Sequence, residues 1–255
     1  MFLQPPFRTA SSPQRIVSLV PSQTELLAYL GADEQTIAIT KFCIHPEEWF
    51  RNKTRIGGTK NIDTLKIINL GPDLILSNKE ENVKEQVELL AERCPVYMSD
   101  IRNYDDAIQM ISDIGVLIHK KIEADKLIKC IREEFAKISN VERKIRSIYL
   151  IWKEPYMTVG GDSFISDMMD KAGFQNMFAP AERYPTLTIE AIRNLQPECI
   201  LLSSEPYPFK EEHIAELQTE LPSAKLLLAD GEMFSWYGSR MLLVPAYFQK
   251  LRNTV

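Results

Sequence analysis

The sequence predicts an α/β protein of two Rossmann-like α/β lobes joined by one long backbone helix, and three observations support this prediction. A strand–helix–strand pattern opens the chain, an amphipathic stretch without breaks lies at mid-chain, and strands alternate with helices again after it. Because strands separated by helices pair in parallel, each half is expected to form its own parallel sheet. The predicted lobes are residues 1–119 and 144–255, with the connecting helix at residues 120–143.

The first lobe opens with a short apolar run at residues 15–21, which is typical of a buried strand. The strand ends at Pro21, and Ser22 and Glu25 have the spacing of a capping box, in which a serine and a glutamate satisfy the first amides of a helix. We therefore expect Ser22 to cap a helix that ends before Gly31. A second strand at residues 36–40 completes the parallel pair.

The same alternation continues to the end of the chain, and one segment repeats. Residues 64–77 and 188–203 both contain a short helix pattern, a proline followed by an acidic residue, and an apolar strand. This repeat favours two similar lobes, although chance similarity between short αβ turns is the alternative. The remaining predicted strands lie at 96–98, 147–151 and 225–229, and the remaining helices at 80–93, 104–118, 163–172, 211–221 and 241–251.

The mid-chain stretch at residues 121–143 contains no Gly and no Pro. Its apolar residues recur at three- and four-residue steps from Ala124 to Ile138, as on one face of a helix. At 1.5 Å per residue this helix would span about 35 Å. It is either a long crossover helix within one sheet or a strut between two lobes, and we favour the strut.

Composition excludes several classes of function. The net charge is −5 with no long basic run, which argues against a nucleic-acid partner, and no apolar run approaches the 18 residues of a membrane span. The first residues do not resemble a secretory signal, so either the protein is cytoplasmic or a natural signal has been removed, and we expect the first. No CxxC pair is present, and Cys130 and Cys199 are expected to be buried thiols, which fits a reducing compartment.

Cys43 and His45 lie two residues apart in the loop after the second strand. Thiolate and imidazole are metal ligands, but a zinc site needs a third and fourth ligand that this loop does not supply. The same residues could form a nucleophilic pair, although no third group is near in sequence to orient the histidine. Contact with a bound ligand and simple loop packing are the other readings, and we predict no intrinsic metal and no catalytic residue.

Two further groups of residues suggest ligand binding. Gly57 and Gly58 would let the backbone approach a ligand closely, or they form a tight turn; neither a phosphate-binding loop nor a GxGxxG motif is present. Aromatic residues follow strand ends in the second half, as suits a bulky, flat ligand, although each could be a core residue. These aromatic residues are Trp152, Tyr156, Trp236 and Tyr237, and Phe42 and Trp49 could face them from the first half.

The residues RIVSLVPSQTELLAYLG at 15–31, KFCIHP at 41–46 and LGPDLIL at 70–76 carry a family resemblance. With these motifs the chain resembles the helical-backbone, class III substrate-binding proteins of bacterial ABC importers, and among them the cobalamin-binding branch. The resemblance extends from Arg15 to about Leu251. It implies two α/β lobes joined by a helix, no enzymatic activity, and a corrinoid or another metal chelate bound as ligand between the lobes.

The resemblance also implies site residues and a partner. Family members carry one surface glutamate per lobe that docks onto the permease; Glu190 matches the second, whereas Leu65 stands at the first position. An ABC permease is therefore a possible partner, and a cytoplasmic relative with a Cys/His-based enzymatic or sensing role is the alternative. We expect a monomer. The implied ligand-binding residues are Ser22, Phe42, Cys43, His45, Gly57, Gly58, Trp152, Tyr156, Trp236 and Arg240.

Overall fold

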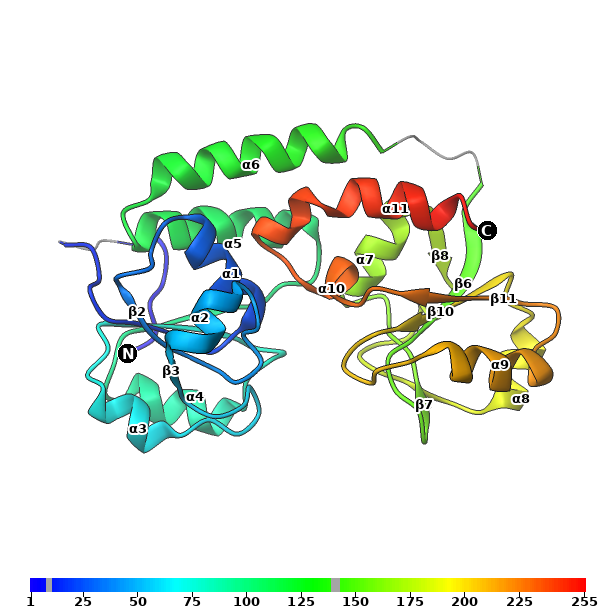
Figure 1. The fold of residues 1–255 in the computed structure, drawn as a ribbon, viewed down its shortest axis with the longest axis horizontal. Helices are drawn as coiled ribbons and strands as arrows, with labels where there is room; N and C mark the ends of the chain where they lie inside the picture. The colour runs from blue at the N-terminus through cyan, green and yellow to red at the C-terminus, as the bar shows by residue number, and fades with distance from the viewer. Residues whose placement is uncertain (8–10, 139–142) are drawn as a thin grey trace. The chain divides into compact units, whose positions relative to one another are not determined.

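The computed structural model describes residues 1–7, 11–138 and 143–255. It is an α/β structure with two parallel sheets, which confirms the predicted fold class (Figure 1). By spatial contact the chain forms two compact units. The first unit contains Met1–Ile101, Asp105–Ile131 and Tyr237–Arg240, and the second contains Arg102–Tyr104, Arg132–Trp236 and Met241–Val255. These units combine segments that are far apart in the chain, whereas the predicted lobes are continuous ranges. The predicted lobe bounds therefore remain a prediction.

The first unit is organised around a five-stranded parallel sheet in the order β3-β2-β1-β4-β5. The central strand β1 is entirely buried and pairs with both β2 and β4. Strands buried on both faces are expected to be mainly apolar, as β1 and the first three residues of β4 are. The bounds are β1 Ile16–Ser18, β2 Thr36–Ile39, β3 Thr54–Arg55, β4 Leu74–Asn78 and β5 Val96–Ser99.

Helices cover both faces of this sheet, with α3 and α4 on one side and α5 and α6 on the other (Figure 1). The N-terminal segment adds a short parallel bridge from Phe2 to Val96 on the edge strand β5, which shields that edge from pairing with other chains. The helices are α1 Pro21–Tyr29, α2 Glu47–Asn52, α3 Thr64–Asn69, α4 Lys84–Ala91, α5 Tyr104–Leu117 and α6 Lys121–Phe135.

The second unit contains a four-stranded parallel sheet in the order β11-β10-β6-β8 and a separate antiparallel pair, β7 with β9. One face of the sheet packs its apolar residues, among them Ile148, Ile200 and Leu202, against Ile192 of α8 and Leu217 of α9. The strands are β6 Ile145–Leu150, β7 Tyr156–Met157, β8 Phe174–Asn176, β9 Thr186–Leu187, β10 Cys199–Ser203 and β11 Lys225–Ala229. The helices are α7 Phe164–Lys171, α8 Ile189–Leu195, α9 Glu211–Glu220, α10 Glu232–Ser235, a 3₁₀ turn at Ser239–Leu242 and α11 Val244–Arg252.

The long mid-chain helix is shorter than predicted. α6 ends at Phe135, and the amides of Lys137 and Ile138 bond to carbonyls only three residues back, as in a tightened last turn. Residues 139–142 of the predicted helix lie outside the described residues. α6 packs closely against α5 at Gly115 of α5, where an added Cβ would lie 2.4 Å from the Cβ of Ala124 in α6. The two helices lie side by side because this position in α5 has no side chain (Figure 1).

Two local predictions from the sequence are wrong. α1 begins at Pro21, with Val20 as its N-cap and no side-chain cap, because a proline in the first helical turn needs no amide partner. Ser22 therefore lies inside the helix, and Glu25 is used elsewhere. Cys130 is exposed on α6, whereas Cys199 is buried in β10 as expected.

Candidate functional site

In each sheet the strands run in parallel, so the residues that follow their carboxyl ends gather at one edge. We call these the carboxyl edges of the first and second units. The predicted site residues fall on both: Ser22, Phe42, Cys43, His45, Gly57, Gly58 and Arg240 belong to the first unit, and Trp152, Tyr156 and Trp236 belong to the second.

Cys43 is completely buried at the carboxyl edge of the first unit. Its Sγ atom lies 3.1 Å from the hydroxyl oxygens of Thr24 and Thr40. Burial raises the pKa of the thiol, although the two hydroxyl contacts oppose the rise. A thiol held neutral and out of solvent is a poor nucleophile. In the described part of the chain, no three His, Cys, Asp or Glu side chains come together as a metal site would require.

Phe42 is the exposed aromatic residue of this edge, with 51% of its surface open to solvent. The ammonium group of Lys41 lies 5.1 Å from the centre of its ring. Gly58 packs against the Phe42 ring, since a Cβ added at Gly58 would lie 3.1 Å from a ring carbon. Gly57 has a φ of +95°, and an added Cβ would lie 2.3 Å from the carbonyl oxygen of Asn61. The glycine pair thus forms a tight turn that holds Phe42 in place, and His45 is half-buried in the same loop.

The segment Tyr237–Arg240 packs within the first unit, where an added Cβ at Gly238 would lie 3.4 Å from the carbonyl oxygen of Ser22. Arg240 is buried and donates two hydrogen bonds to the Glu25 carboxylate, at 3.0 and 2.7 Å. Burial raises the pKa of the Tyr237 phenol well above its usual value, and the negative charge of Glu81 adds to the rise. Arg240 is therefore engaged by the protein itself.

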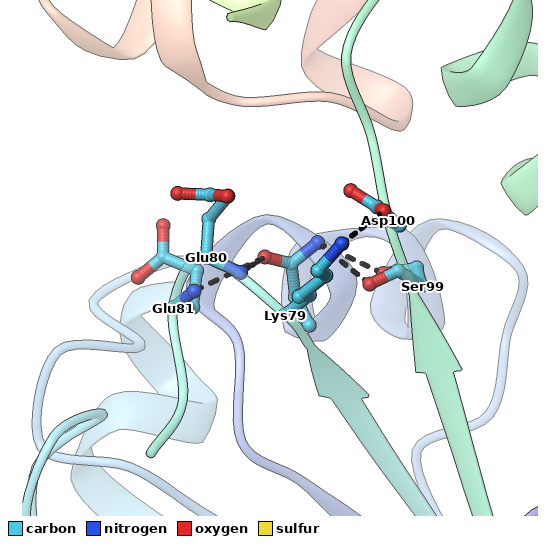
Figure 2. A network of polar contacts seen from close by, with 6 residues as sticks. Lys79, Glu80, Glu81, Ser99 and Asp100 are labelled. Carbon is cyan, nitrogen blue, oxygen red and sulfur yellow. Dashed lines mark hydrogen bonds and ion pairs between the residues drawn. The ribbon is translucent and has the colours of Figure 1, made fainter. Parts of the chain in front are cut away.

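A polar network that the sequence did not single out closes the ends of β4 and β5. The Asn78 side chain accepts hydrogen bonds from the amides of Glu80 and Glu81 and donates to Ser99. Lys79 pairs with Asp100 at 2.8 Å, and Figure 2 shows the two groups facing each other beside Ser99. The sequence signal that could have indicated this network is the polar residue that ends each strand, Asn78 in β4 and Ser99 in β5.

A cavity of about 210 Å³ lies in the first unit beside this network. It is bounded by the N-terminal segment, β5 and α5, and Tyr97 donates a hydrogen bond across it to Asp113. None of the predicted site residues lines this cavity.

In the second unit, Trp152 follows β6 and is 40% exposed. Its ring contacts the edge of Tyr207, with the ring centres 5.7 Å apart. Tyr156 is half-buried in β7, and burial raises the pKa of its phenol. Trp236, in contrast, has only 7% of its surface exposed. Trp152 and Tyr207 form the accessible aromatic surface at this edge.

The indole of Trp236 is held by a residue that sequence reasoning missed. Glu205 follows β10, and its Oε1 accepts hydrogen bonds from Trp236 Nε1 at 3.0 Å and from Ser235 Oγ at 2.6 Å. Burial raises the pKa of this carboxyl, and the negative charges of Glu232 and Asp230 add to the rise. A carboxylate directly after the buried strand CILLS was the available signal.

The chain belongs to the periplasmic binding protein family, whose sequence pattern matches residues 16–224. It is similar to the vitamin B12-binding protein of Vibrio parahaemolyticus serotype O3:K6, with 26% identity over 217 residues, 83% of this chain and 78% of that one. The protein is a substrate-binding protein and not an enzyme.

Two solved structures show the same fold. One is the periplasmic vitamin B12-binding protein BtuF of Vibrio cholerae, with a TM-score of 0.75, 23% identity, and coverage of 94% of this chain and 98% of that one. The other is the periplasmic heme-binding protein HutB of Vibrio cholerae, with a TM-score of 0.79, 19% identity, and coverage of 94% and 98%.

The family overturns the expectation of a cytoplasmic protein, because it points to the periplasm or to an extracellular location. The unpaired cysteines, although they fit a reducing compartment, do not distinguish between compartments. Three of the four thiols are buried and unpaired, and a buried thiol is protected in any compartment. None of the described helices combines the length and the apolar character needed to cross a bilayer.

Proposed function

We propose that this protein binds a corrinoid or another metal chelate, unaltered, as the substrate-binding component of an ABC importer. One observation carries the proposal: each carboxyl edge exposes an aromatic surface next to hydrogen-bonding groups. Phe42 supplies it in the first unit, and Trp152 with Tyr207 supplies it in the second. Large aromatic faces with a few polar groups suit a flat macrocycle. Family membership and the relatives that bind vitamin B12 and heme support the same ligand class.

Calorimetric titration with cyanocobalamin, cobinamide, haem and a ferric hydroxamate tests the proposal. We expect at least one ligand to bind, and we expect Phe42→Ala and Trp152→Ala each to weaken that binding about tenfold, since a stacked aromatic contact contributes roughly 1 to 3 kcal/mol. Tyr29→Ala is the control, because Tyr29 is an exposed aromatic residue at the end of α1. Absence of binding by all four ligands at millimolar concentration would reject the proposal.

The proposed permease contact involves Glu190, which is exposed in the first turn of α8. Leu65 stands at the equivalent place in α3 and is 72% exposed. Glu190→Gln should leave ligand affinity unchanged and reduce ligand uptake by cells that express the importer. An equal uptake by the variant and the wild type would show that Glu190 is only a favourable charge at a helix N-terminus.

A further inference from the structure

Glu205 brings a carboxylate to the carboxyl edge of the second unit, two residues after β10 ends. Both described hydrogen bonds to its side chain, from Ser235 and Trp236, go to Oε1. Among the described residues no group donates to Oε2. This oxygen is a hydrogen-bond acceptor at the same edge as the aromatic surface of Trp152 and Tyr207.

The surroundings of Glu205 disfavour a charge. Burial and the negative charges of Glu232 and Asp230 raise the pKa of its carboxyl, while the hydrogen bonds from Ser235 and Trp236 oppose the rise. Its charge also acts on the phenol of Tyr149 in β6, and no Lys or Arg of the described residues pairs with it. Gly231 leaves the space for its side chain, because an added Cβ would lie 2.4 Å from Glu205 Cγ. A carboxylate that the fold accommodates at a loss of stability is characteristic of a functional position.

We propose that Oε2 of Glu205 accepts a hydrogen bond from an N–H group of the bound ligand, and that Glu205 thereby selects corrinoids over haem. The inference rests on the proposed function. The rim of a corrinoid carries carboxamides, each with two N–H donors, whereas the rim of haem carries carboxylates that only accept. A carboxylate on the protein attracts the first and repels the second. Trp236 and Ser235 fix the carboxylate so that the free oxygen has one orientation.

The test compares cobinamide and haem as probes for wild type and Glu205→Gln by calorimetry at pH 8. The variant keeps the shape of the side chain and an oxygen that accepts from Trp236, but it loses the charge and places an amide N–H where Oε2 was. We expect cobinamide to bind about tenfold more weakly or worse, as for a lost hydrogen bond to a charged group, and haem to bind equally or more tightly. Glu220→Gln is the matched control, because Glu220 ends α9 and pairs with exposed Arg193; it should change neither affinity.

A structural role would give a different pattern. If Glu205 only holds Trp236 in place, the variant will lose affinity for both probes alike, and this outcome would overturn the proposal. Ser235→Ala removes one donor to Oε1 and leaves Oε2 unchanged, so cobinamide affinity should change by less than about threefold. A wild type that binds haem but not cobinamide would overturn this inference and leave the proposed function standing. A wild type that binds neither these probes nor any other chelate would overturn both.

Discussion

The two units share the same construction at the edge where their central strands begin, and they differ at the edge where those strands end. In the first unit Asp73 accepts hydrogen bonds from the amides of Gln14 and Arg15, and the Arg15 side chain donates to the carbonyl of Leu70. In the second unit the corresponding bonds recur: Glu198 accepts from the amide of Arg146, and the Arg146 side chain donates to the carbonyl of Leu195.

The sheets are also equivalent in order. The sequence β2-β1-β4-β5 of the first unit corresponds to β8-β6-β10-β11 of the second, and β3 is an addition at the edge of the first. Even the turn after β4 recurs after β10, since Glu80 N donates to the Asn78 side chain and Glu205 N donates to the Ser203 side chain. The internal repeat in the sequence is therefore a structural repeat.

The carboxyl edges have diverged. In the first unit the Tyr237–Arg240 segment covers Ser22, and Lys79 neutralises Asp100. In the second unit Glu205 lies among other acids. The contrast indicates that the hydrogen bonds at the edge where the central strands begin serve the stability of the fold, because they join a strand to a helix end within each unit. The diverged edges carry the groups that differ in charge and exposure, which is where we propose that ligand selection takes place.

The largest expected effect concerns the closure of the first unit by its distant segment. Arg240→Ala leaves the Glu25 carboxylate without its buried partner, so we expect the free energy of unfolding to fall by about 3 kcal/mol. Arg193→Ala, which breaks the exposed pair with Glu220 in the second unit, should lower it by less than about 1 kcal/mol. Urea denaturation measures both. Equal effects would mean that the segment does not contribute to the stability of the first unit.

The next effect concerns the repeated clamp. Asp73→Ala removes two amide acceptors at 2.7 and 2.8 Å, and we expect a loss of about 2 kcal/mol. Glu198→Ala should have a smaller effect, because Glu198 accepts only one backbone amide, at 3.1 Å. Thermal unfolding of the two variants provides the comparison. A larger effect in the second unit would contradict the equivalence of the two clamps.

The sequence predicted the fold to the level of this repeat because apolar periodicity and the proline–acid pattern are local signals. The α/β class and the parallel sheets followed from them, whereas the lobe bounds and the connecting role of the mid-chain helix remain predictions. The end of that helix was placed too late, since apolar periodicity continues to Ile138 whereas α6 ends at Phe135 and its last four-residue hydrogen bond is donated by the amide of Ala136. The cap at Ser22 was wrong because Pro21 can itself begin a helix, and Glu25 has Arg240 as its partner.

The candidate site was less predictable, because its character depends on contacts between residues far apart in the chain. Spacing placed Cys43 in a loop together with Thr40, but the second hydroxyl that contacts its Sγ atom, that of Thr24, comes from α1. No local pattern relates Glu205 to Trp236, which lies 31 residues later. Phe42 and Trp152 were predicted at strand ends, and their exposure agrees with a surface role, although ligand contact by these residues remains a prediction.

The smallest expected effect concerns the pH dependence of stability at the two ends of β10, where Glu198 precedes the strand and Glu205 follows it. Hydrogen bonds from Arg146 and Arg143 lower the pKa of Glu198, so its contribution is present above about pH 4.5, the ordinary value, and is lost as the pH falls through the lowered pKa. Burial raises the pKa of Glu205, so the folded state holds that proton more tightly than the unfolded state does. Stability should therefore decrease as the pH rises through the raised pKa.

Glu205→Gln removes the second dependence and leaves the first, so the variant should unfold at a higher urea concentration than the wild type at pH 8 and at the same concentration near pH 4.5. Glu198→Gln should give the opposite result, with a loss at pH 8 that disappears in acid. Urea midpoints across this range measure both. If Glu205→Gln instead lowers the urea midpoint at pH 8, the Glu205 carboxylate stabilises the fold through Trp236 and Ser235. Glu205 would then be a structural residue like Glu198, and not one kept for ligand selection.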